Sequence, residues 1–418
     1  MATVIETATH AEAAWPVFRG GRVRRIAGLL GLIGAIVFVI GLVLDPTRAM
    51  YAYLTAYVTV AAVAIGVLIL ALAQYATNAH WPAAVRRLQE AVIGVFPLLV
   101  VLFVPIAIGL DYLYVWADPT ATVSAHDHHK IAAKGAWLST AGFVLRAVLY
   151  LGIFTLVAEL LRRWSRRRDL VIPAADAPPV EAPIVVVEGE AALRRERRFA
   201  SAMLPAVGLA TTFAAFDWIM SLQPAWFSTI FGVYYFAGGF GAGIAVVAIL
   251  AWRARVTGVS RAAITPHHFH ALGRLLFAFV VFWAYAAYFQ GFIIRIADRP
   301  DEVTFYILRL QHGWDIVLWL LLIVHFAVPF LLLLPRRLKL RPRYVAAVAG
   351  IVLLGHVLDM YWLVMPVAGS PVSWIDFAAF AFVVGACVLA IAWRQRGLPM
   401  VATGDPNLST GIQYVSPT

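Results

Sequence analysis

The chain has 418 residues, of which 62% are hydrophobic and only 13% are charged. This composition lies far outside the range of soluble domains and predicts an integral membrane protein with many spans. The formal net charge of +11 does not indicate nucleic-acid binding, because the basic residues stand mainly at the ends of apolar segments, where they set topology. The single cysteine, Cys387, excludes a disulfide framework and an iron–sulfur cluster held by this chain alone.

Ten apolar segments are long enough to cross a hydrocarbon core of about 30 Å as helices. They fall at residues 26–44, 51–73, 89–110, 136–160, 199–222, 228–252, 270–296, 310–334, 344–366 and 373–393. Most of the 33 Lys and Arg residues lie in the N-terminal arm and in the alternate connections on its side. Both termini are therefore expected to be cytoplasmic.

An Arg-rich and Pro-rich stretch near the centre of the sequence divides the spans into two halves. We expect a cytoplasmic linker there, with its arginines near the headgroups of membrane lipids. The predicted divisions are an N-terminal arm at 1–25, spans one to four at 26–161, the linker at 162–198, spans five to ten at 199–394 and a cytoplasmic tail at 395–418. The polar tail is expected to be weakly ordered.

The segment 216–243 closes the fifth span and opens the sixth. A very short turn at 221–224 predicts that the two helices run antiparallel as neighbours. Glycines at 232, 238, 239, 241 and 243 allow a partner helix to approach closely.

Several polar side chains lie at membrane depth, where a charge is costly and is retained mainly when it faces protein or water. One set is expected near the outer surface, in a pocket suited to quinone: Asp217, Gln290, His312, Asp315, His356 and Asp359. A second set at staggered depths is suited to carry a proton: Glu159, Arg274, His325, Tyr285, His356, Asp359 and Asp217. The simpler alternative for each residue is a hydrogen bond that joins two helices.

Two further cations are interpreted as structural. Arg146 stands in the middle of a span and is expected to pair with a carboxylate, and Lys134 precedes the same span. We predict no metal site, because the run from His126 to His129 is typical of a solvated loop. We also predict no intrinsic haem, because the helix with His312 and His325 has no partner helix with a matching pair of histidines.

Long motifs in this sequence resemble the ActF membrane subunits of bacterial alternative complex III, which belong to the NrfD-like superfamily. The strongest is Phe216-Asp217-Trp218, Met220-Ser221-Leu222, Pro224 and Trp226-Phe227-Ser228-Thr229. Others are Lys134, Trp137-Leu138, Phe143 and Arg146; Leu272-Gly273 and Phe277; Phe282-Trp283-Ala284-Tyr285; Gln290, Pro300 and Glu302; His325-Phe326 and Pro329-Phe330; and His356 to Asp359, Tyr361-Trp362 and Pro366. Departures are Ser139 in place of Asn, Arg274 in place of Lys, and a missing aromatic near Ile294-Arg295.

The resemblance implies two inverted four-helix bundles with one flanking helix at each end, in the bacterial cytoplasmic membrane. It also implies a complex with a homologous quinol-binding membrane subunit, an iron–sulfur subunit, and multihaem and monohaem cytochrome c subunits. Quinol is then the substrate of the complex, and the haem c and the clusters reside on the partners.

Three functions follow as hypotheses. The first is a membrane subunit without redox cofactors of its own, which scaffolds a quinol oxidoreductase complex with cytochrome c or an oxidase as acceptor and conducts protons. The second is direct quinone binding in the outer pocket. The third is a stand-alone ion or substrate transporter, a class whose architecture also uses inverted halves.

Overall fold

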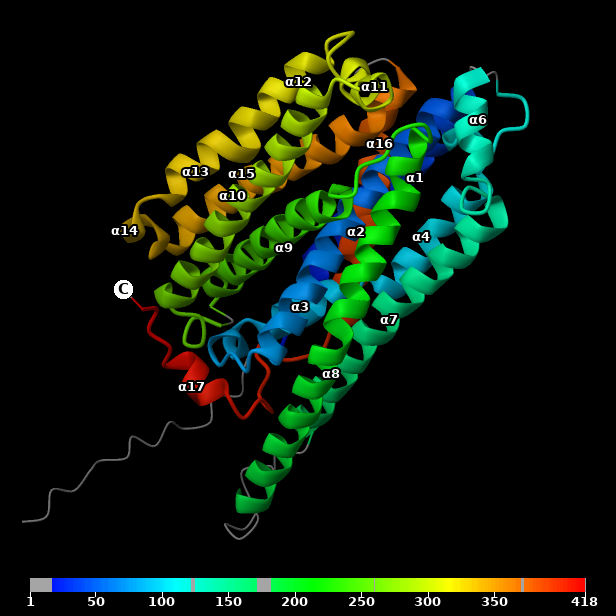
Figure 1. The fold of residues 1–418 in the computed structure, drawn as a ribbon. Helices are drawn as coiled ribbons and strands as arrows, with labels where there is room; N and C mark the ends of the chain where they lie inside the picture. The colour runs from blue at the N-terminus through cyan, green and yellow to red at the C-terminus, as the bar shows by residue number, and fades with distance from the viewer. Residues whose placement is uncertain (1–16, 122–124, 171–181, 259, 370–371, 418) are drawn as a thin grey trace, which may run out of the picture.

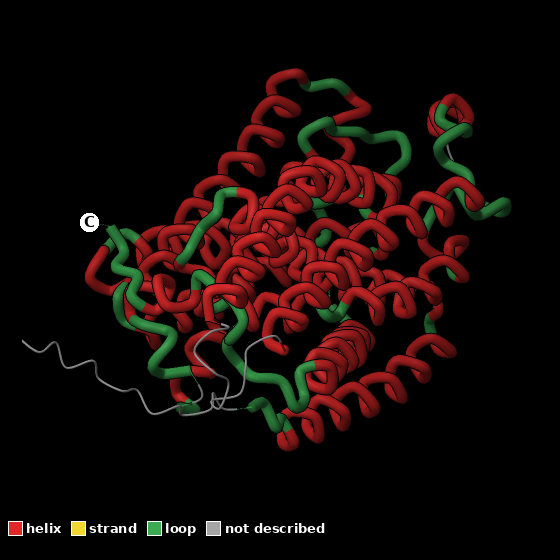
Figure 2. Tube along the Cα trace, turned by 90° about the horizontal axis from the view of Figure 1, so that it is seen from below, coloured by secondary structure: helices red, strands yellow, loops and turns green. Residues whose placement is uncertain are grey.

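The computed structural model describes residues 17–121, 125–170, 182–258, 260–369 and 372–417. These residues form helices and loops (Figure 2). An isolated antiparallel bridge joins Val17 and Pro399. Ten helical stretches among them are long and apolar enough to cross a membrane. The prediction of a multi-span, all-helical membrane protein is confirmed to this extent.

The spans are built from twelve helices and one π-helical turn, because two of the spans are composite. The first five spans are α1 (Gly21–Leu44), α2 (Pro46–Ala76), α3 (Arg86–Ile93) with α4 (Phe96–Ile108), α7 (Thr140–Leu170) and α8 (Ala182–Trp218). The last five are α9 (Phe231–Val256), α10 (Pro266–Ala297), α12 (Trp314–Leu321) with the π-helical turn Leu322–Ala327 and α13 (Val328–Leu333), α15 (Pro342–Val364) and α16 (Trp374–Arg394).

Short helices lie in the connections. They are η1 (Trp81–Ala84), α5 (Leu110–Leu113), α6 (Ala125–Ala133), η2 (Met220–Leu222), α11 (Pro300–Leu308), α14 (Arg336–Lys339), η4 (Met365–Ala368) and α17 (Leu408–Ile412). Helices α6 and α11 lie at one end of the molecule, and α14 and α17 lie toward the other (Figure 1). We call the end that carries Val17 and α17 the terminal end, and the opposite end the distal end.

The centre of the molecule is the contact between α2 and α9, which glycines make close. A Cβ atom added at Gly239 would lie 2.7 Å from the carbonyl oxygen of Ala62, and one at Gly243 would lie 2.9 Å from the backbone nitrogen of Val67. Only glycine leaves room for backbones at this separation. The predicted small-residue face of the sixth span is thus confirmed at these two positions, and α2 is the helix it meets.

Around this centre lie two groups of helices and a flanking pair. Helices α4, α7 and α8 gather beside α2, and α10, the α12–α13 span and α15 gather beside α9. The flanking pair is α1 and α16, which meet at Gly31 and Gly385. The fifth span, α8, packs on α7 and α2 as well as on α9. The division predicted between residues 161 and 199 therefore does not separate the two groups of helices.

The connections also differ from the predicted ones. Helix α7 extends to Leu170 and α8 begins at Ala182, so both ends of the predicted linker are helical. The turn after α8 is longer than predicted, because α9 begins only at Phe231 and leaves Ser228 in a loop. In that loop, the hydroxyl group of Ser228 donates a hydrogen bond to the side chain of Gln290.

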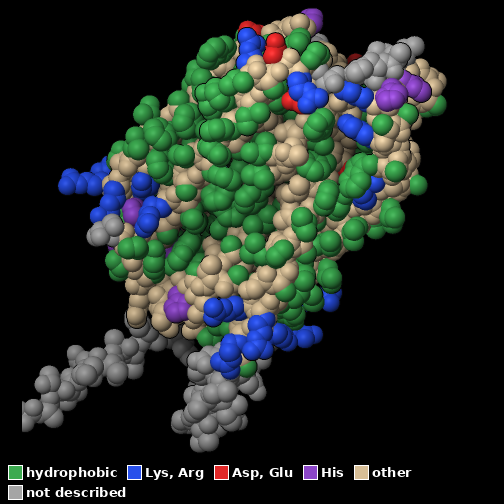
Figure 3. All heavy atoms as spheres, in the orientation of Figure 1, with side chains coloured by type: hydrophobic (Ala, Val, Ile, Leu, Met, Phe, Trp, Pro, Cys, Tyr) green, Lys and Arg blue, Asp and Glu red, His purple; other side chains and the backbone are tan. Residues whose placement is uncertain are grey.

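The surface has an apolar band between two charged ends. Figure 3 shows hydrophobic side chains over the middle of the visible face, with arginines and lysines gathered toward the terminal end and both signs of charge at the distal end. Apolar residues are also exposed on α1 and α10, such as Leu29 at 60% and Tyr288 at 63%. A band of this kind matches a bilayer core.

The C-terminal tail is ordered over its described residues, which corrects the expectation from its polar composition. Helix α17 packs on η1, Asp405 pairs with Arg86, and the carbonyl oxygen of Gly411 lies 3.0 Å from Nε2 of His268. At the start of the tail, the backbone N–H of Gly397 donates to the carbonyl oxygen of Phe18, and the backbone N–H of Phe18 donates to the carbonyl oxygen of Leu398. Charge pairing and backbone hydrogen bonds thus tie the tail to the terminal end.

Candidate functional site

The most distinctive polar group in the interior is the carboxyl group of Asp359 on α15, which is fully buried. Tyr234 on α9 donates its hydroxyl proton to Oδ1, and Trp283 on α10 donates its indole N–H to Oδ2 at 3.0 Å. No Lys, Arg or His forms an ion pair with this carboxyl group among the described residues. Its charge is therefore offset by two neutral donors rather than by a cation.

His356 lies one turn before Asp359 on α15 and is also fully buried. Its Nε2 atom lies 3.3 Å from the carbonyl oxygen of Thr59 on α2. Because a carbonyl oxygen only accepts hydrogen bonds, Nε2 carries the proton and Nδ1 of the neutral ring is left as a base. That Nδ1 atom is buried without a hydrogen-bond partner in the described part of the chain.

Glycine at position 238 brings the two groups to one place. A Cβ atom there would lie 3.3 Å from Oδ2 of Asp359 and 3.4 Å from Nδ1 of His356. The free base of the imidazole and an oxygen of the carboxyl group thus border the same point on α9. The two atoms form no hydrogen bond with each other, so proton exchange between these groups requires a bridging water molecule.

His325 completes the cluster from the other side of Trp283. It lies in the π-helical turn Leu322–Ala327, and its ring stacks on the Trp283 ring with centroids 4.0 Å apart. Its Nδ1 atom is also buried and lacks a partner among the described residues. π-Helical turns are frequent at functional sites, because they displace a side chain from the regular helical position. We call Tyr234, Trp283, His325, His356 and Asp359 the Asp359 cluster.

Gln290 lies on α10, two turns beyond Trp283. Its amide donates to the hydroxyl oxygen of Tyr306 at 3.3 Å and accepts from the hydroxyl group of Ser228 at 3.0 Å. Gln290 thus joins the loop before α9 to α11.

Asp217 forms a separate group with α7. Arg146 donates to it from Nε at 2.8 Å and from Nη2 at 3.0 Å, Trp137 donates its indole N–H at 2.8 Å, and Tyr150 donates its hydroxyl at 3.1 Å. The predicted pairing of Arg146 with a carboxylate is confirmed. Lys134 has a structural contact nearby, a 2.6 Å bond from Nζ to the carbonyl oxygen of Pro224, and burial lowers the pKa of this lysine.

The other predicted residues lie elsewhere. His312 is exposed in the loop before α12, and Asp315 is half-buried in the first turn of α12. Tyr285 is 51% exposed on the outer face of α10, and Arg274 is exposed on the same helix. The structure thus brings together only His325, His356 and Asp359 from the predicted sets. The single outer pocket expected from the sequence is divided into separate groups.

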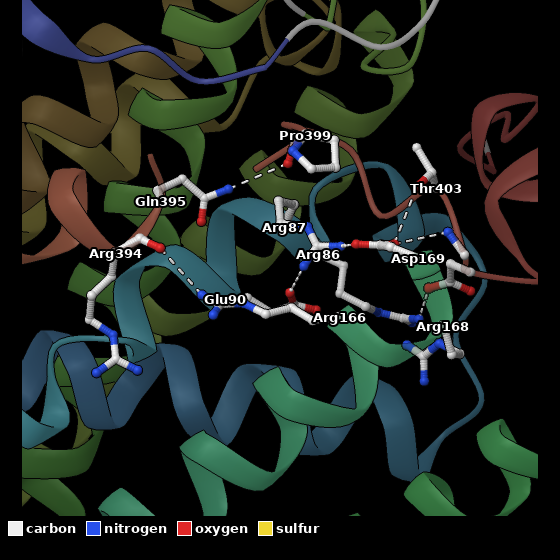
Figure 4. Close-up of polar contacts among 12 residues, drawn as sticks. Arg86, Arg87, Glu90, Arg166, Arg168, Asp169, Arg394, Gln395, Pro399 and Thr403 are labelled. Carbon is white, nitrogen blue, oxygen red and sulfur yellow. Dashed lines mark hydrogen bonds and ion pairs between the residues drawn. The ribbon is translucent and has the colours of Figure 1, made fainter. Parts of the chain in front are cut away.

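Glu159 belongs to a network of charges at the terminal end. It accepts a 2.5 Å hydrogen bond from Arg394 on α16. Figure 4 shows the neighbouring part of the network, where Arg87 reaches both Glu90 and Asp169, and Asp169 also accepts from the tail at Thr403 and Gly404. These contacts hold α3, α7, α16 and the tail together.

The terminal-end network does not continue along α2 to the Asp359 cluster. Between Thr59, which contacts His356, and Gln74 at the terminal end, every residue of α2 is apolar. At 1.5 Å per residue this gap is about 22 Å. The predicted series of proton carriers is therefore interrupted along this helix.

The sequence does not predict two of the buried polar contacts in the structure. Tyr234 gave no signal, because a tyrosine in an apolar span is common. The sequence also gives no indication of the buried ion pair between Arg48 and Asp376, in which Nε lies 3.0 Å from Oδ1. Tyr361 donates to the same carboxylate at 2.7 Å.

The described residues contain no group of three or more His, Cys, Asp or Glu side chains that could hold a metal ion. A scan against protein-family models finds no match to this chain, and a search of curated proteins likewise finds no similar sequence. The class defined by fold and site is a ten-span helical membrane protein with a buried carboxyl–imidazole cluster.

Proposed function

We propose that this chain is a membrane subunit of a quinol:electron-acceptor oxidoreductase complex in a bacterial cytoplasmic membrane. It holds no redox cofactor of its own, scaffolds the complex and carries protons released when a sister subunit oxidises quinol. The two groups of helices are inverted copies of one bundle, and both termini face the cytoplasm. The acceptor is cytochrome c or an oxidase, reached through iron–sulfur and cytochrome c subunits.

The observation that supports this proposal is the Asp359 cluster. Four of its five residues, Trp283, His325, His356 and Asp359, fall within the motifs that resemble the ActF subunits. A carboxyl group buried without a cation is costly when ionised, and protonation removes that cost. Hydrogen bonds from Tyr234 and Trp283 stabilise the ionised form, so both protonation states are accessible to Asp359.

The proposed step is a proton transfer between two atoms. No hydrogen bond joins Nδ1 of His356 to Asp359, so the proton passes from Oδ2 of the protonated carboxyl group to Nδ1 through one bridging water molecule. The imidazolium then holds protons on both nitrogens, and the carboxylate is left with its two donors. The position of Asp359 near the distal end of α15 favours proton release on that side of the membrane.

Gentle detergent extraction of the native membrane, followed by capture of this chain, tests the assignment to a complex. We expect the eluate to contain a second, homologous membrane subunit and to give the reduced-minus-oxidised spectrum of c-type haem, with iron–sulfur signals in electron paramagnetic resonance. A colourless chain recovered alone would contradict the proposal and would favour a transporter.

A further inference from the structure

The lipid-facing side of α4 and α7 carries a groove of about 770 Å³. The two helices run side by side in Figure 1, and the groove lies between them. Its walls are almost entirely apolar, and the exposed residues Val104 and Val148 belong to them. Three polar side chains line it, and all lie on α7 at intervals of four residues: Thr155, Glu159 and Arg163.

The groove is hollow because of a glycine on α7. A Cβ atom added at Gly152 would have no atom within 4 Å, so the space beside it is open. One turn further on, the hydroxyl group of Thr155 is buried and has no hydrogen-bond partner in the described part of the chain. A buried hydroxyl without a partner is rare in native proteins, and an acceptor on a molecule bound in the groove would satisfy it.

The polar end of the groove carries a positive charge that no acidic side chain of the described residues offsets. Glu159 is neutralised by Arg394 at 2.5 Å. Arg163 is exposed, lines the groove and forms no ion pair within the described residues. Side chains on a helix lean toward its N-terminus, so the guanidinium group of Arg163 leans back over the groove toward Glu159.

We propose that this groove is a binding site for a phospholipid with an anionic headgroup. An acyl chain lies along α7 past Gly152, the hydroxyl group of Thr155 donates to an ester carbonyl oxygen, and Arg163 binds the phosphate. Charge complementarity selects this occupant, because a neutral lipophile such as a quinone leaves the guanidinium group unmatched.

The site is tested on the complex purified from its native membrane. Native mass spectrometry and phosphate analysis measure phosphatidylglycerol bound per chain after mild delipidation, against phosphatidylcholine added as competitor. The variant Arg163→Gln removes the charge, and Gly152→Leu fills the hollow. The matched controls are Arg167→Gln, an exposed arginine of α7 outside the groove, and Gly350→Leu, a glycine of α15 that also has open space around it.

We expect Arg163→Gln to lower phosphatidylglycerol retention about fivefold, as for one basic residue at a lipid headgroup, and Gly152→Leu to abolish it. Both controls retain the wild-type amount. Equal retention of phosphatidylglycerol in all four variants would contradict the proposed binding site. Extraction of an isoprenoid quinone whose amount falls in Gly152→Leu, with phospholipid unchanged, would overturn the choice of ligand. If Gly152→Leu does not fold, the comparison of lipid retention between Arg163→Gln and Arg167→Gln still tests the site.

Discussion

Asp217 accepts hydrogen bonds from two nitrogens of Arg146, at 2.8 and 3.0 Å. The two residues join α8 to α7 at the distal end, and only the arginine is partly exposed, at 17% of its side chain. Asp359 is equally buried and has no such partner among the described residues. The two carboxylates therefore differ in what removing their charge does to the protein.

Replacement of Asp217 by Asn leaves Arg146 without its anion. We expect the variant to lose about 3 kcal/mol of stability, because breaking a partly buried pair strands a charge. Thermal unfolding in detergent measures the loss. A double-mutant cycle with Arg146→Gln isolates the pairwise energy, and a cycle that shows no coupling would contradict the ion pair.

Asp359→Asn is expected to behave in the opposite way. The amide oxygen accepts from the indole N–H of Trp283, and the amide NH2 group donates to the hydroxyl oxygen of Tyr234. The substitution also removes a charge that no cation compensates. The unfolding midpoint therefore stays equal to that of the wild type or rises. A fall as large as that of Asp217→Asn would show that an unrecognised cation pairs with Asp359.

The docked tail depends on the ion pair of Asp405 with Arg86, whose side chains are 0% and 3% exposed. We expect Asp405→Asn to release the tail, because it leaves a buried arginine uncompensated. Hydrogen–deuterium exchange over residues 403–416 measures the release as faster exchange. Asp111→Asn, at an exposed aspartate of α5, serves as the control, and identical exchange in both variants would contradict the docking.

Two glycines on α9 form a matched pair. Gly239→Ala places a methyl group 2.7 Å from the carbonyl oxygen of Ala62 and is expected to cost about 1–3 kcal/mol. At Gly241 the nearest atom lies at 3.7 Å, so alanine fits and the higher helix propensity stabilises the protein by up to about 1 kcal/mol. If the thermal midpoints of both variants shift in the same direction, the close packing of α2 on α9 is contradicted.

The sequence predicts the spans well, because hydropathy over about 20 residues reports membrane crossing directly. It predicts how deep in the membrane a polar residue lies, but not which side of its helix the side chain faces. Trp283 and Tyr285 are two positions apart on α10, yet one is 5% exposed and the other 51%, because two residues rotate a helix by about 200°. Rotation is set by packing with neighbouring helices, which no single segment encodes.

The same limit applies to partners. An arginine in the middle of a span predicts a carboxylate partner, and Arg146 has one, but only the fold determines that it is Asp217 on the next helix. The tail shows the reverse error. Its composition is typical of a weakly ordered segment, while its order comes from contacts with residues far away in sequence, such as Asp405 with Arg86. Composition carries no information on such pairings.

The most direct test of the central proposal is proton release during quinol oxidation by the purified complex in sealed vesicles. The comparison is wild type, Asp359→Asn and Asp315→Asn, a distal aspartate outside the Asp359 cluster. We predict that Asp359→Asn lowers proton-coupled turnover by at least about tenfold, the lower range for loss of a proton-transfer group, while Asp315→Asn matches the wild type. Equal turnover and equal proton release in all three would contradict a proton-carrying role for Asp359.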